Sequence, residues 1–128
     1  MEKLIYLDTH AAIWLYAGDM SLFFSQTLRL LAESPLAVSP AVLLEMQYLL
    51  EIGRISADPD RILKSLEKSI GLKVCDLAFH KIITESIKQS WTRDPFDRLI
   101  VAHASLAHAG LITKDETILK HYAKALWR

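Results

Sequence analysis

Short apolar runs alternate along this chain with longer segments in which apolar residues recur at helical spacing. Four runs have the length and the β-branched or aliphatic character of buried strands, and a fifth strand is expected at the end of the chain. The predicted strands cover residues 3–7, 36–39, 72–75, 111–113 and 125–127. The predicted helices cover residues 9–17, 21–33, 40–52, 58–69, 77–90 and 94–110, and a short helix begins at Asp115.

The helix boundaries carry clear local signals. Ser39-Pro40 supplies a capping residue and a proline at the first helical position, and Gly53 marks the end of that helix. Strands that alternate with helices indicate parallel crossover units, which stack as a three-layer α/β/α domain. With no linker, repeat or low-complexity tract, residues 1–128 are expected to form a single domain around a mainly parallel sheet of four or five strands.

Composition narrows the class further. The chain is 52% hydrophobic, which excludes intrinsic disorder, and no apolar run approaches the ~20 residues that span a bilayer. Cys75 is the one cysteine, so a disulfide framework is excluded and a buried core thiol is expected. With no signal peptide evident, these features favour a cytoplasmic protein without a membrane partner.

Acidic residues lie where the predicted elements meet. Asp8 directly follows the first strand, and Asp115 follows the fourth by two residues. Glu45 lies in the helix after the second strand, and Asp94 and Asp97 begin the long helix before the fourth. Because ligands bind beyond the carboxyl ends of parallel strands, we expect these acids at one edge of the sheet.

Each acid also has an ordinary structural explanation. Asp8 and Asp115 could simply cap helices, and Asp94 and Asp97 have the spacing of a capping arrangement. Glu45 differs, because it falls within the apolar stripe of its helix. A carboxylate there requires a buried Lys or Arg, protonation to the neutral acid, or a metal ion.

Taken together, the acids favour a metal site. Four separate elements contribute Asp8, Glu45, Asp97 and Asp115, and an all-oxygen donor set suits Mg²⁺ or Mn²⁺ rather than zinc. Metal ions held by such acids commonly serve phosphoryl and phosphodiester chemistry.

Four blocks of sequence resemble one known family. They read YLDTH at 6–10, SPAVLLE at 39–45, RDPFDRLIVA at 93–102 and LITKD at 111–115. In this order and spacing the blocks are similar to those of PIN-domain nucleases, and more narrowly to the VapC toxins of prokaryotic VapBC toxin–antitoxin pairs. The similarity extends over essentially the whole chain.

The resemblance implies an endoribonuclease that cleaves tRNA or ribosomal RNA at an Mg²⁺ or Mn²⁺ site formed by Asp8, Glu45, Asp97 and Asp115. It makes Asp94 an accessory acid and Thr9 and Thr113 polar neighbours of the ligands. It also implies a cognate VapB-type antitoxin and a homodimer. The sequence departs from many relatives at His103, where they carry Gln, a position not expected to touch the metal.

Other residues admit two interpretations. Lys88, Arg93 and Arg98 flank the acids and are candidates for contacts with RNA phosphates, although a solvated surface role is as plausible. His10 could touch substrate, but a scaffold role is favoured. The aromatic residues of the first two predicted helices are expected in the core, unless an exposed subset forms a patch for an antitoxin or a second copy. These aromatic residues are Trp14, Tyr16, Phe23 and Phe24.

Two other functions remain open on the sequence alone. A receiver-type signalling domain has a similar length and a Mg²⁺-binding acidic pocket, but such domains usually carry adjacent acids after the first strand, where this chain has Asp8-Thr9. An Asp-x-Asp phosphatase fails similarly, because Asp8-Thr9-His10 lacks the second acid. A catalytically silent PIN-like binding module is disfavoured by the full set of acids.

Charge agrees with a localised acidic site. The chain has 15 basic and 15 acidic residues, so its formal net charge is zero and a polycationic coating protein is excluded. Setting aside four acids for one pocket leaves 11 acids against 15 basic residues, a remainder of +4, or +5 if Asp94 is also set aside. Neutrality is therefore compatible with RNA binding at a cation-filled cleft.

Overall fold

A computed structural model describes residues 3–127 and shows a parallel five-stranded sheet with helices on both faces. The strands are β1 (Ile5–Leu7), β2 (Leu36–Val38), β3 (Lys73–Val74), β4 (Gly110–Ile112) and β5 (Ala125–Leu126). Their order in the sheet is β3-β2-β1-β4-β5, and every neighbouring pair is parallel. The predicted three-layer α/β/α class is confirmed, with five strands.

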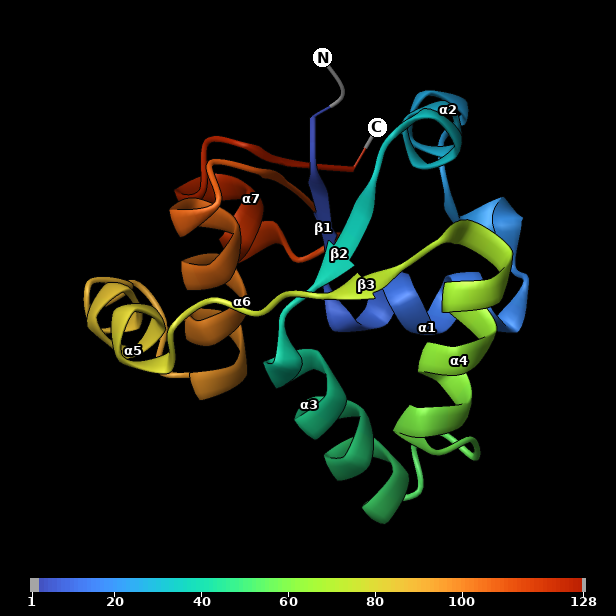
Figure 1. Cartoon of the computed structure of the whole chain (residues 1–128), viewed down its shortest axis with the longest axis horizontal. Coiled ribbons are helices and arrows are strands. Elements are labelled where there is room, and N and C mark those ends of the chain that lie inside the picture. Colours follow the sequence, from blue (N-terminus) through green and yellow to red (C-terminus); the bar gives the residue numbers. More distant parts are fainter. Residues whose placement is uncertain (1–2, 128) are drawn as a thin grey trace.

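The connections between strands are helical. The helices are α1 (Thr9–Ala17), α2 (Ser25–Glu33), α3 (Pro40–Glu51), α4 (Pro59–Ile70), α5 (Phe79–Ile87), α6 (Pro95–Leu106) and α7 (Glu116–His121). Figure 1 shows α5 and α6 on one side of the sheet and α1 and α4 on the other. No helix within residues 3–127 is long and apolar enough to cross a membrane.

The centre of the sheet is the centre of the core. Strands β1, β2 and β4 are almost wholly buried, as expected for a sheet covered on both faces. Tyr6 pairs with Ala37 on one side and with Leu111 on the other, so the three strands are in register and their carboxyl ends lie at one edge.

The structure corrects several predicted boundaries. The predicted helix 21–33 is a short 3₁₀ turn (Met20–Leu22) followed by α2, because Phe23 and Phe24 have extended backbones. The buried Phe23 ring packs against Trp14 and Trp127. This packing stabilises the extended backbone at Phe23, and the helix is interrupted there. Phe24, by contrast, is exposed.

Two helices and one strand are shorter than predicted. Helix α6 ends at Leu106 rather than near Gly110, because His108 has a positive φ and the backbone N–H of Ala107 closes the helix. Helix α5 occupies only the middle of the predicted 77–90 segment. Both residues of β3, at the edge of the sheet, are exposed, and the neighbouring Cys75 is half-buried rather than a core thiol.

Candidate functional site

The carboxyl ends of the central strands open into a pocket of about 460 Å³ whose lining is dominated by acids. The acids that line it are Asp8, Glu45, Asp94, Asp97, Asp115 and Glu116. The four principal site residues predicted from the sequence therefore lie together, with Asp94 beside them. Glu116 was not predicted, although it follows Asp115 directly in the chain.

Asp8 occupies the base of this pocket, at the junction of β1 and α1. Its side chain is 7% exposed. One carboxylate oxygen accepts a hydrogen bond from the backbone N–H of Thr9 (2.8 Å), and the other accepts one from the Thr113 hydroxyl (2.6 Å). Asp8 is thus a helix cap as well as a pocket residue, and a carboxylate has enough lone pairs to serve both roles.

Glu45 projects from α3 toward the same strands. Its Oε1 accepts a hydrogen bond of 2.5 Å from the hydroxyl of Thr9. No Lys or Arg among residues 3–127 forms an ion pair with it, so the buried ion pair considered from the sequence is absent. The apolar stripe around Glu45 is also partly open to solvent, since Tyr48 and Ile52 are exposed.

The remaining acids differ in how they are held. Asp94 caps α6 by accepting from the backbone N–H groups of Phe96 and Asp97, which confirms the predicted capping arrangement. Asp115 caps α7 through the Ile118 N–H (2.9 Å). The carboxylate of Asp97 has no hydrogen-bond partner within the described part of the chain.

Burial and crowding strongly disfavour negative charge on Asp97. Desolvation, followed by repulsion from Asp94, Asp8, Asp115 and Glu45, raises the pKa of Asp97 to about 8. Burial also raises the pKa of Asp8 and of Glu45, against the opposing effect of their hydrogen bonds to threonine. The pocket therefore favours the uptake of positive charge, as protons or as a cation.

The donor chemistry of the pocket suits a hard divalent cation. The donors are carboxylate oxygens, the ligands that Mg²⁺ and Mn²⁺ prefer. Within residues 3–127, no three His, Cys, Asp or Glu side chains are close enough in this conformation to form a finished ligand set. Threonine and backbone contacts hold Asp8, Glu45 and Asp94, and Asp97 carries no such restraint.

The pocket lining also contains two aromatic rings and a lysine. His10, Trp14 and Lys114 contribute to it. His10 is exposed and can be reached by substrate, and the scaffold role favoured for it stays a prediction. Trp14 and Lys114 were not predicted as site residues, but one signal was available: Trp14 lies four residues after His10 and hence on the same helix face.

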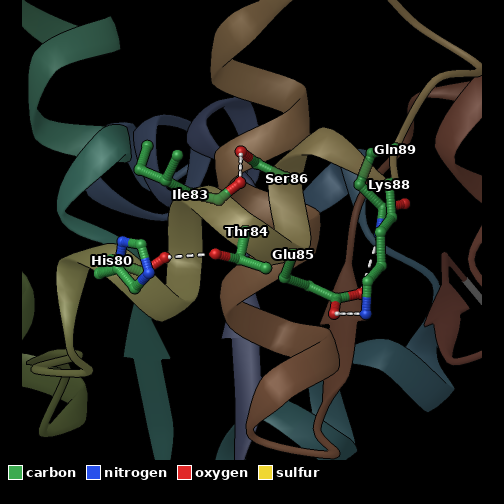
Figure 2. A network of polar contacts seen from close by, with 7 residues as sticks. All are labelled: His80, Ile83, Thr84, Glu85, Ser86, Lys88 and Gln89. Carbon is green, nitrogen blue, oxygen red and sulfur yellow. Dashed lines mark hydrogen bonds and ion pairs between the residues drawn. The ribbon is translucent and has the colours of Figure 1, made fainter.

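The predicted phosphate-binding residues lie elsewhere. None of Lys88, Arg93 and Arg98 lines the pocket. Lys88 follows α5 and forms an ion pair with Glu85 at 3.4 Å, as Figure 2 shows. Arg93 and Arg98 donate to the backbone carbonyls of Ser90 and Thr92. Their contact with RNA stays a prediction.

His103 belongs to the packing beneath the site rather than to the pocket. It is buried, and its Nδ1 lies 2.8 Å from the Ser39 hydroxyl and 3.1 Å from the Leu99 carbonyl. Burial lowers its pKa, so the ring is held neutral. Its absence from the pocket lining agrees with the expectation that it does not touch a metal.

Comparison with protein families identifies the domain. Residues 5–125 match the PIN domain family. The chain belongs to this family. The match spans nearly the whole described chain and includes every acid of the pocket. Family membership removes the support for a receiver-type domain.

Solved structures with the same fold come from toxin–antitoxin complexes. VapBC2 from Rickettsia felis, bound to a promoter DNA fragment, has a TM-score of 0.68 and 20% identity, over 98% of this chain and 99% of that one. A Klebsiella pneumoniae toxin–antitoxin complex has a TM-score of 0.66 and 20% identity, over 95% of each chain. VapBC-1 from nontypeable Haemophilus influenzae has a TM-score of 0.63 and 18% identity, over 98% of this chain and 96% of that one. The comparison with curated proteins gives no match.

Proposed function

We propose that this PIN-domain protein is a metal-dependent endoribonuclease and the toxin of a VapBC-type pair. The observation that carries the proposal is the pocket at the carboxyl end of the sheet, where carboxylates crowd together and, among residues 3–127, none forms an ion pair with Lys or Arg. A purely structural acid cluster would be a standing cost to stability, since burial and the neighbouring carboxylates raise the pKa of Asp97. A cation-dependent activity explains why such a cluster is kept.

Asp8, Glu45 and Asp97 are the proposed ligands of Mg²⁺ or Mn²⁺, with Asp115 close enough in the lining to assist. A bound divalent cation supplies charge neutralisation at the phosphate and a lower pKa for water. The hydroxyls of Thr9 and Thr113 orient two of these acids by donating to Glu45 and Asp8. These hydroxyls therefore act as positioning groups.

Asp115 is the residue proposed to orient the attacking water. One of its carboxylate oxygens caps α7, and the other has no hydrogen-bond partner within residues 3–127. That free oxygen can accept a hydrogen bond from water. The water oxygen attacks phosphorus and gives up a proton to solvent. As the new P–O bond forms, the P–O3′ bond breaks and the 3′-oxygen takes up a proton from solvent, which leaves a 5′-phosphate and a 3′-hydroxyl.

RNA is the proposed substrate. The charge outside the acidic pocket sums to a mildly positive remainder, which attracts a phosphate backbone without coating it. Lys114, in the pocket lining, is better placed to meet a phosphate than Lys88, Arg93 or Arg98. A tRNA or a ribosomal RNA is the expected target, and the cytoplasm is the expected compartment.

The direct test is cleavage of a labelled, structured RNA by the purified protein. Cleavage is expected with Mg²⁺ or Mn²⁺ and not with EDTA, and the products should carry 5′-phosphates. Asp76→Asn is a matched control, because Asp76 is an acid outside the acidic pocket. Binding of RNA without cleavage in either metal would instead indicate a catalytically silent binding module.

A VapB-type antitoxin and a second copy of this chain are the proposed partners. The solved structures with this fold include VapBC complexes. The candidate dimer surface consists of exposed apolar side chains along α3, at its C-terminal cap, and around the start of α5. These residues are Leu44, Tyr48, Ile52, Leu77 and Phe79.

Dimer formation can be tested by light scattering after size-exclusion chromatography. Phe79→Glu places a charge on a side chain that is 73% exposed, so it should give monomers without unfolding the protein. Phe24→Glu, at another exposed phenylalanine, should leave the dimer intact. Wild-type monomers at micromolar concentration would contradict the dimer.

A further inference from the structure

The part of the pocket lining that is not acidic has the composition of a nucleobase-binding surface. Trp14 and His10 lie one helical turn apart on α1, with ring centroids 5.8 Å apart. His10 lies two residues after Asp8, the acid at the base of the pocket. An aromatic surface is thus continuous with the proposed cleavage site.

The Trp14 ring is held in place from behind. Phe23 and Trp127 pack against it in edge-type contacts, with centroid distances of 6.5 Å and 5.6 Å. Trp14 is nevertheless only half-buried, and it still lines the pocket. Because its neighbours already fix the indole, stacking a ligand on it costs little additional ordering.

Lys114 shows that a face of the indole is reachable from the pocket. Its ammonium lies over the Trp14 ring at 5.8 Å from the centroid, and the lysine is exposed. An exposed cation–π contact between a lysine and an indole raises the equilibrium constant for that pairing by about 2- to 5-fold. Stacking of a base on an aromatic side chain is worth about 10-fold or more. A base can therefore displace the ammonium, which is then free to pair with a phosphate.

We propose that His10, Trp14 and Lys114 form a subsite that stacks one unpaired nucleobase next to the scissile phosphate. The inference rests on the proposed ribonuclease function and specifies its substrate, because a base is free to stack only where the RNA is single-stranded. The enzyme accordingly cuts in loops or other unpaired segments. Stacking tolerates any base, so the subsite selects for lack of pairing more than for sequence.

Binding is the first test, because it does not depend on cleavage. A short single-stranded oligoribonucleotide in EDTA, where no cleavage is expected, should quench the tryptophan fluorescence of wild-type protein. Trp14→Leu should weaken binding about 10-fold and remove most of the quenching. The matched control is Trp91→Leu, since Trp91 is also half-buried but stacks on His121, outside the pocket. Equal affinities for Trp14→Leu, Trp91→Leu and wild type would overturn the subsite.

Cleavage is the second test. Once the cut is mapped, an abasic nucleotide is placed in turn on each side of it. One of the two replacements should lower kcat/KM about 10-fold for wild type and less than about 2-fold for Trp14→Leu. Lys114→Ala and His10→Ala, both at exposed positions, should each raise KM by about 3-fold with little change in kcat. These two variants do not disturb the packing behind Trp14.

The two tests separate the subsite from the nuclease proposal. If wild type cleaves RNA but neither abasic replacement lowers kcat/KM, the subsite is wrong and the ribonuclease stands. If wild type binds the oligonucleotide through Trp14 but cleaves no RNA in either metal, the ribonuclease is wrong and the base-binding subsite stands.

Discussion

The two ends of the parallel sheet are made from the same strands but have opposite chemistry. At the carboxyl end, Asp8 and its neighbours form a pocket lined by six acids. At the amino end, a groove of about 540 Å³ is lined mainly by aliphatic side chains such as Leu4, Ile5 and Leu126. The carboxyl end therefore gathers acidic side chains, and the amino end exposes mainly aliphatic side chains.

The difference teaches where stability and chemistry reside. Burial and then repulsion from the neighbouring carboxylates raise the pKa of Asp97 to about 8, so keeping that group ionised works against folding. Aliphatic contacts at the amino end favour folding, and no acid among the described residues lines that groove. Changes at the carboxyl end should therefore affect activity far more than stability, and changes at the amino end should do the reverse.

The largest expected effect is on activity, from Asp97→Asn. Removing a proposed ligand should lower RNA cleavage in Mg²⁺ by at least about 100-fold, since loss of even an outer-shell partner commonly costs 10- to 100-fold. The fold should remain intact, because the Asp97 carboxylate has no hydrogen-bond partner within the described chain. Cleavage at the wild-type rate by a well-folded variant would show that the site is assigned wrongly.

A smaller effect, on stability, is expected at the amino end from Gly110→Ala. The added Cβ would lie 2.9 Å from Cδ1 of Ile5, which is the flexible end of a side chain. The free energy of unfolding should fall by about 1 kcal/mol, at the low end of overpacking costs, with cleavage per folded molecule unchanged. Urea denaturation measures the change.

The control for this contact is the Ile5→Val background, which lacks Cδ1. There, Gly110→Ala should cost clearly less than in wild type. An equal cost in both backgrounds would mean that another contact is responsible.

The pH dependence of stability should differ between wild type and Asp97→Asn. An aspartate with a folded pKa of about 8 and an unfolded pKa of 3.8 destabilises the fold progressively as pH rises from 3.8 to 8. In metal-free buffer the variant should melt at nearly the wild-type temperature at pH 4. At pH 8 it should melt at a clearly higher temperature than wild type. A melting-temperature difference that does not change with pH would contradict the pKa assigned to Asp97.

The smallest expected effect is on the pH dependence of stability at His103. Here stability is lost as pH falls, whereas at Asp97 it is lost as pH rises. The pKa of His103 is lowered by burial, so the unfolded chain binds a proton more readily as pH falls below 6.5, and the fold loses stability. Between pH 7 and pH 5, wild type should lose more stability than His103→Gln. Chemical denaturation at the two pH values measures this, and identical losses would show that the ring titrates normally.

The sequence predicts a structural feature well when that feature depends on residues close together in the chain. Asp8, Asp94 and Asp115 follow strands or open helices, so the rule for parallel sheets brought them to one edge without coordinates. The break at Phe23 could not be predicted, since it depends on packing against Trp127, far away in the chain. The direction of a long surface side chain such as Lys88 is likewise set by a neighbour, here Glu85.

The aromatic part of the site shows the same limit. Trp14 was expected in the core, and its contacts with Phe23 and Trp127 agree with that. Only the three-dimensional arrangement shows that the same ring also lines the acidic pocket. A periodic pattern indicates which face of a helix is apolar, but not where that face ends and a pocket begins.

The carboxylates at the carboxyl end of the sheet are proposed to hold a divalent cation. Calorimetric titration of the metal-free protein with Mn²⁺ tests it most directly. Saturable binding is expected for wild type and for the control Asp76→Asn, with affinity at least about 10-fold weaker for Asp97→Asn. Equal affinity in all three proteins, or no binding by wild type, would contradict the claim.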